Sequence, residues 1–198
     1  MPYFTILIKN VFLHYIKRVK MKKRLIIIFL LVSCLGFSQA NGTQGISEQN
    51  VSKENWNTFK SETGKFEAAI TGSVSQQSVD KESSSTFKIS FDADNMYYLI
   101  SSTKHKSDLE SSIDNLLEVS ISTFSEQVKG TISNRREVFL ENAKGLYAEM
   151  DMVETGFKLE YYVYMRGIYQ YQVVVYAAYD SYDAAVANRF FKSFKTID

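Results

Sequence analysis

Few side chains in this 198-residue sequence have the type and spacing that chemistry requires. Glu149 and Asp151 lie two residues apart, so on a strand they project from one face, and Glu154 follows in the next turn. Paired carboxylates hydrolyse glycosides, but only when the two groups face each other across a cleft at a set separation. A weak hydrolase that uses this pair is therefore an alternative hypothesis, and a solvated strand face is the simpler interpretation.

Oxygen and nitrogen ligands for a metal ion are equally sparse. Asp92 and Asp94, followed by Asn95, are minor candidates for a hard cation such as calcium, but the twelve-residue loop with its closing Glu is missing. A hairpin turn explains these residues more simply. His105 is the only His after residue 40, and no Cys accompanies it to complete a soft-metal site. We therefore expect no metal and no cofactor.

The sequence also lacks the motifs of common catalytic machinery. It contains no Ser nucleophile elbow, no phosphate-binding loop and no HExxH. The single Cys is Cys34 and the single Pro is Pro2, so the chain after residue 40 has neither a thiol nucleophile nor a disulfide. We predict a protein without catalytic activity.

Charge is distributed unevenly along the chain. Residues 1–40 contain seven of the 23 Lys and Arg side chains and none of the 22 Asp and Glu side chains. Residues 41–198 therefore carry a formal charge of −6. Since clustered Lys and Arg supply most of the affinity for nucleic acid, we expect no nucleic-acid partner.

Tyrosine is concentrated near the end of the chain. Eight of the 13 Tyr residues fall between positions 161 and 182. Tyr suits half-buried sheet positions, where cross-strand aromatic pairs stabilise the sheet and the hydroxyl stays hydrated. Tyr is also favoured in binding surfaces. A small-ligand or glycan-binding face that includes Tyr162, Tyr164 and Tyr176 is therefore a second alternative.

The first forty residues predict export. A basic segment at residues 21–24 precedes 13 mostly apolar residues, Leu25 to Phe37, and Ser38 and Ala40 occupy the −3 and −1 positions for cleavage after Ala40. We interpret residues 21–40 as a signal peptide and residues 1–20 as an extension from an upstream start codon. The alternative is that residues 1–40 are retained as a membrane anchor.

Cys34 raises lipidation as an alternative to cleavage after Ala40. Residues 31–34, Leu-Val-Ser-Cys, resemble a lipobox, which would make Cys34 the lipidated N-terminus. The residues after Cys34 are more apolar than the usual polar tether, so lipidation is the minor alternative. The ending at residues 37–40 resembles signal peptides of the Bacteroidetes, which indicates a Gram-negative envelope. We expect a periplasmic or secreted protein that meets the membrane only through its signal segment or through lipidation.

Residues 41–53 are polar and predict a flexible leader, and residues 54–198 predict one α+β domain. Alternating apolar residues and short connections indicate antiparallel strands. We expect a sheet of about six strands, sandwiched by a long helix and a shorter C-terminal helix. The expected strands are 66–70, 87–91, 96–100, 136–140, 146–153, 157–165 and 169–178, the expected helices are 108–129 and 181–191, and residues 73–82 are expected to form a loop.

Capping residues set the expected helix ends. Ser107 with Glu110 predicts a capping box at the start of the long helix, and Gly130 predicts a left-handed C-terminal cap. Asp180 or Ser181 is the expected N-cap of the second helix.

The order of these features resembles the PsbP-like superfamily, which includes an extrinsic photosystem subunit and a Ran-binding nuclear import factor. The resemblance covers residues 54–196. It is carried by the segments Trp56-Asn-Thr-Phe59, Gly64-Lys-Phe66-Glu, Asn95-Met-Tyr-Tyr98, Gly145-Leu-Tyr-Ala-Glu149 and Phe190-Phe191-Lys-Ser193-Phe194. The Pro-rich loop common in such domains is replaced by Pro-free residues 70–74. The resemblance implies an α+β fold and a non-enzymatic accessory role. We therefore expect an exported, non-catalytic envelope protein that binds a protein partner.

Overall fold

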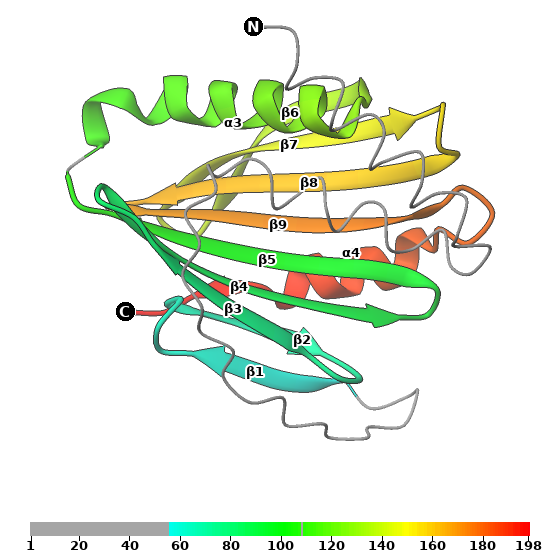
Figure 1. Ribbon diagram of the computed structural model, residues 1–198, viewed down its shortest axis with the longest axis horizontal. Coiled ribbons are helices and arrows are strands. Elements are labelled where there is room, and N and C mark those ends of the chain that lie inside the picture. Colours follow the sequence, from blue (N-terminus) through cyan, green and yellow to red (C-terminus); the bar gives the residue numbers. More distant parts are fainter. Residues whose placement is uncertain (1–55, 108) are drawn as a thin grey trace, which may run out of the picture. The chain divides into compact units, whose positions relative to one another are not determined.

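In the computed structural model, residues 56–107 and 109–198 are described, and the predicted signal peptide, leader and Cys34 lie outside them. The described residues form a seven-stranded antiparallel sheet in the order β3-β4-β5-β9-β8-β7-β6 and a three-stranded sheet in the order β1-β2-β10 (Figure 1). The strands are β1 Asn57–Ser61, β2 Phe66–Ile70, β3 Ser75–Asp80, β4 Ser84–Ala93, β5 Met96–His105, β6 Thr131–Leu140, β7 Ala143–Met152, β8 Phe157–Arg166, β9 Tyr169–Ala178 and β10 Lys195–Thr196. The helices are a 3₁₀ turn η1 Glu110–Ser112, α3 Ile113–Val128 and α4 Ala184–Ser193.

Tight turns set the register of the long strands. Asp94 and Asn95 both have positive φ, 51° and 60°, so a two-residue turn joins β4 to β5 with Ala93 opposite Met96. Gly167, with φ of 54°, lies in the turn that places Arg166 opposite Tyr169 on β8 and β9. These short connections explain why sequential strands are neighbours.

Helix α3 covers one face of the large sheet, here called the α3 face. Its buried residues are Leu117, Ile121, Phe124 and Val128, which fall at helical spacing and form one apolar stripe. The ring of Phe124 stacks on Tyr161 of β8 with centroids 4.4 Å apart. This packing fixes α3 over β7 and β8.

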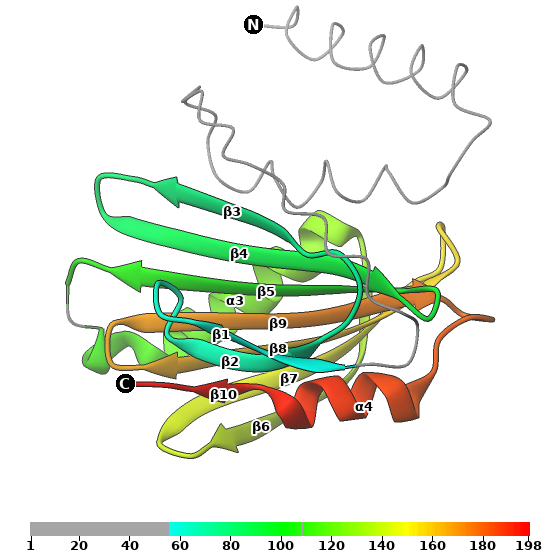
Figure 2. The same ribbon diagram turned by 90° about the horizontal axis from the view of Figure 1, so that it is seen from below.

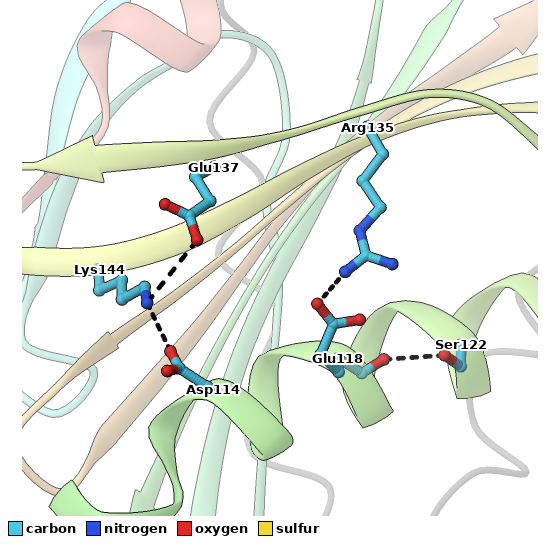
Figure 3. A network of polar contacts seen from close by, with 6 residues as sticks. All are labelled: Asp114, Glu118, Ser122, Arg135, Glu137 and Lys144. Atoms are coloured by element: carbon cyan, nitrogen blue, oxygen red, sulfur yellow. Dashed lines mark hydrogen bonds and ion pairs between the residues drawn. The ribbon is translucent and has the colours of Figure 1, made fainter.

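Ion pairs flank this stripe and tie α3 to the edge of the sheet (Figure 3). Lys144 Nζ lies 2.6 Å from Asp114 Oδ1 of α3 and 3.8 Å from Glu137 Oε1 of β6. Glu118 of α3 is paired with Arg135 of β6. These side chains are partly to largely exposed, so solvent screens each pair and its contribution to stability is small.

Helix α4 and the small sheet cover the opposite face, here called the α4 face (Figure 2). Phe190 of α4 is fully buried, and its ring contacts Tyr98 at a centroid distance of 4.9 Å and Phe91 at 5.8 Å. Phe66 of β2 packs on Phe194, with centroids 5.8 Å apart. Trp56 lies edge-on to Tyr98. Aromatic side chains thus dominate this half of the core.

The predicted α+β class with a mainly antiparallel sheet is confirmed, but the strand number is wrong. The described residues contain seven strands in the main sheet and three more in a small sheet, whereas a single sheet of about six strands was expected. Residues 73–82, expected as a loop, contain β3, and β6 begins at Thr131 rather than at residue 136. Both are edge strands with mostly exposed residues, so they lack the apolar alternation on which the prediction relied.

The predicted caps are also corrected. Residues 110–112 form a 3₁₀ turn and α3 begins only at Ile113, so Ser107 is not its N-cap; the first buried residue of the stripe is Leu117. At the other end Lys129, not Gly130, takes the left-handed conformation, while the Gly130 amide donates to Ser125 O in a Schellman arrangement.

The second helix is capped by Asp183 instead of Asp180 or Ser181. Its carboxylate accepts hydrogen bonds from the amides of Ala185 and Val186. The Ser181 hydroxyl donates a hydrogen bond to the Asp180 carboxylate, and both residues lie in the turn before the helix. Among the described helices, none has the length and apolar character needed to span a bilayer.

Candidate functional site

The three predicted ligand-binding tyrosines do not lie together. Tyr162 and Tyr164 project from β8 on the α4 face, where Tyr162 contacts Phe191 with centroids 4.5 Å apart and Tyr164 packs on Phe194 at 6.1 Å. Tyr176 lies opposite Leu159 on the other face, against Tyr97. Tyr164 and Tyr176 are 8% and 5% exposed. The structure therefore gives these rings packing partners on two separate faces.

Polar side chains gather instead on the α4 face of β6, β7 and β8. Glu149 of β7 and Glu160 of β8 are directly opposite each other, and both are half-buried. We call this group the tyrosine–carboxylate cluster; it comprises Arg136, Tyr147, Glu149, Lys158, Glu160, Tyr162 and Tyr182. Glu160, Tyr147 and Tyr182 were not among the predicted site residues. Lys158 and Glu160 alternate with Leu159 and Tyr161, and this period of two is the signal that could have placed the charged residues on one face.

Two phenols in the cluster act as hydrogen-bond donors. Tyr182, which precedes α4, donates to Glu160 Oε1 at 2.7 Å, and Tyr147 donates a longer bond of 3.4 Å to Glu149 Oε2. Burial raises the pKa of both Tyr182 and Tyr147, and the carboxylate of Glu160 raises each further. Both phenols therefore stay protonated at neutral pH and hold the carboxylates in place.

Cations complete the cluster. Lys158 Nζ lies 2.5 Å from Glu149 Oε1 and 5.1 Å from the ring centroid of Tyr182. The guanidinium of Arg136 lies 4.0 Å from the ring centroid of Tyr147. Each carboxylate thus already has a partner within the cluster. This pattern is typical of a network that fixes the segment before α4 onto the sheet.

The predicted hydrolase pair does not face across a cleft. Glu149 and Asp151 lie on the same strand, and Asp151 accepts a hydrogen bond of 3.0 Å from Tyr179. Glu154 is exposed in the turn between β7 and β8.

The minor metal candidates lie at the β4–β5 hairpin. Asp92 pairs with Tyr97 within the sheet, and Asp94 forms the turn with Asn95. His105 lies at the far end of β5. Burial lowers the pKa of its imidazole and so favours the neutral form. Within residues 56–107 and 109–198, no three His, Cys, Asp or Glu side chains gather as metal ligands do.

Strand β6 is a second feature that the sequence did not single out. It ends the large sheet, is ten residues long and is exposed along most of its length. Phe139 is 71% exposed and Ile132 36% exposed, whereas Val138 and Leu140 are half-buried against the core of the α4 face. An edge strand presents unpaired backbone groups to solvent, and such strands are usually short, charged or interrupted by Pro. Strand β6 is long and contains no Pro, and its charged residues, Arg135, Arg136 and Glu137, lie in its middle. Residues 138–140 at its end are uncharged, so this end is the less protected part of the edge.

The fold and these two features define a mainly antiparallel α+β protein with a helix on each face of its large sheet. No protein-family model matches the chain, and no curated protein is significantly similar to it in sequence.

Proposed function

We propose that this chain is an exported, non-catalytic envelope protein that binds a protein partner by adding a strand of that partner to β6. The observation that carries the proposal is the exposed ten-residue edge strand with the apolar residues Val138, Phe139 and Leu140 at one end. Main-chain hydrogen bonds at such an edge supply affinity, and side chains on alternate faces supply specificity.

Sequence features support the cellular setting. The basic, apolar and small-residue segments of residues 21–40 favour export to the periplasm or medium, with lipidation at Cys34 as the alternative. The order of strands and helices over residues 54–196 supports a PsbP-like domain, a class with accessory roles. The ligand-binding and hydrolase alternatives are less favoured, because the tyrosines lie on two faces and Glu149 and Asp151 already have partners.

A matched pair of variants tests strand addition. Phe139→Lys places a charge on the exposed edge, whereas Val153→Lys makes a comparable change in the β7–β8 turn, where Val153 is 76% exposed. Both are surface substitutions, so stability changes by less than about 0.5 kcal/mol. We expect Phe139→Lys to lower recovery of a specific envelope protein by at least about fivefold, since an edge charge blocks strand pairing.

Capture from envelope extract on the immobilised protein, followed by quantitative mass spectrometry, measures this recovery. Val153→Lys serves as the control and should recover the same protein as the unmodified chain. Equal recovery by both variants, or no protein above background, would contradict the proposal.

A further inference from the structure

The two faces of β6 differ in what they offer an incoming strand. On the α3 face Arg135 is paired with Glu118, and Glu137 with Lys144 (Figure 3). Charge on this face is therefore already neutralised within the protein. An incoming strand gains little there from a charge of its own.

The α4 face of β6 carries one cation and no carboxylate between residues 134 and 140. Register places Asn134, Arg136, Val138 and Leu140 on this face, opposite Glu149, Tyr147, Gly145 and Ala143 of β7. Glu149, the neighbouring carboxylate, is paired with Lys158. Among the described residues Arg136 forms no ion pair, and its side-chain hydrogen bond is to the neutral phenol of Tyr162.

Arg136 is positioned to receive a carboxylate from outside the sheet. Its side chain is exposed, and its guanidinium lies 4.0 Å from the ring centroid of Tyr147. Stacking occupies one flat face of the guanidinium, and one side-chain hydrogen bond joins Arg136 to Tyr162. A guanidinium has five N–H donors, so others remain at its rim, where a carboxylate binds in a fork geometry. Tyr147, which is 4% exposed, holds the cation in place.

The apolar part of the same row lies immediately beyond this cation. Val138 and Leu140 are half-buried beside the core of the α4 face, so part of each side chain stays exposed on the last strand of the sheet. The register irregularity of β6 falls between Ile132 and Asn134, so residues 134–140 form a regular strand. An added strand can therefore run past all four residues of the row.

We propose, on the basis of the strand addition above, that the partner is an extended protein segment with apolar residues at two alternate positions and an acidic residue at the third. In an antiparallel arrangement these positions face Leu140, Val138 and Arg136 in that order. The opposite edge is a poor site for this segment. Strand β3 contributes mainly Ser and Gln side chains and ends in Asp80, which repels an acidic residue.

A synthetic peptide tests this specificity on protein purified from cells that express the full chain. The probe is the blocked peptide Ser-Val-Thr-Val-Thr-Glu-Thr-Ser, and amide chemical shifts in NMR titrations report the dissociation constant and the residues affected. We expect shifts at residues 134–140. Replacing Glu by Lys in the peptide should weaken binding by about five- to tenfold, because the ion pair with Arg136 is lost.

Two protein variants identify the cation. Arg136→Gln should weaken binding of the Glu peptide by about five- to tenfold. Its dissociation constant should then equal that of the Lys peptide on the unmodified protein. Arg135→Gln, one residue away and on the other face, should change binding by less than about twofold because Glu118 already neutralises Arg135. Equal effects of the two substitutions would overturn the assignment of Arg136.

Backbone methylation separates strand addition from other binding modes. Two versions of the peptide carry N-methyl groups on alternate residues, one in each phase. Only the version whose methyl groups face β6 should lose binding, because alternate amides of a strand point to one neighbour. Equal binding of both versions, shifts confined to β3, or no binding of any peptide would overturn the inference. Phe139→Lys can still reduce capture of an envelope protein when these peptide results are negative. The binding of a partner at β6 and the acidic specificity of that partner are therefore tested separately. Concentration-dependent dimerisation through β6 would assign the edge to a second copy of this chain and also overturn the inference.

Discussion

Phe190→Ala is expected to lower the free energy of unfolding by about 3–5 kcal/mol, the usual cost of removing a fully buried Phe side chain. Phe190 is 0% exposed and contacts Phe91, Tyr98 and Trp56. Its removal leaves a cavity between α4 and the large sheet. Part of the cost comes from this cavity, because the β-sheet and α4 relax only partially.

Urea unfolding followed by circular dichroism measures this loss. Phe139→Ala is the matched control, since the same side chain is removed from the exposed edge strand, where it is 71% exposed. We expect the control to change stability by less than about 0.5 kcal/mol. Similar losses in the two variants would contradict the packing of α4 against the sheet.

Gly145→Ala is the second substitution with a large expected effect. A Cβ atom at Gly145 would lie 2.5 Å from Tyr164 Cδ1 and 2.5 Å from Val163 O. The carbonyl belongs to the backbone of the neighbouring strand, so β7 and β8 must move apart to accommodate the methyl group. We expect a loss of about 2–3 kcal/mol in the free energy of unfolding.

A second glycine separates this steric effect from backbone strain. Gly156 has φ of 73° and open space around its Cα, so Gly156→Ala should cost about 1 kcal/mol from the left-handed conformation alone. Urea titration of both variants compares the two. Gly145→Ala should be the more destabilising, and a smaller effect than that of Gly156→Ala would contradict the close approach of Tyr164 over Gly145.

The sequence predicted the covered strands better than the edges. Phe87, Ile89 and Phe91 alternate because one face of β4 packs against the core, and this alternation is visible without a structure. Strands β3 and β6 pair on one side only and expose most of their residues, so their polar side chains carry no period of two. Residues 136–140 of β6 were predicted as a strand, whereas the exposed residues 131–135 were not. The same exposure makes β6 the proposed binding edge.

The candidate site was predictable only in part, because alternation within a strand does not say how two strands are aligned. Tyr162 and Tyr164 were correctly placed on one face of a single strand. The short turn after Arg166 pairs it with Tyr169, and the resulting register sends Tyr176 to the other face. Tyr182 joins Glu160 only because the chain folds back after β9, a contact that no local pattern indicates.

Hydrogen exchange of the captured complex tests strand addition at β6 most directly. Backbone amides that gain a strand partner exchange more slowly, and mass spectrometry of proteolytic fragments locates them. We predict slower exchange in residues 131–140 when the partner is bound, with no change in residues 75–80 at the opposite edge. Protection at residues 75–80, or protection confined to the helices, would contradict strand addition at β6.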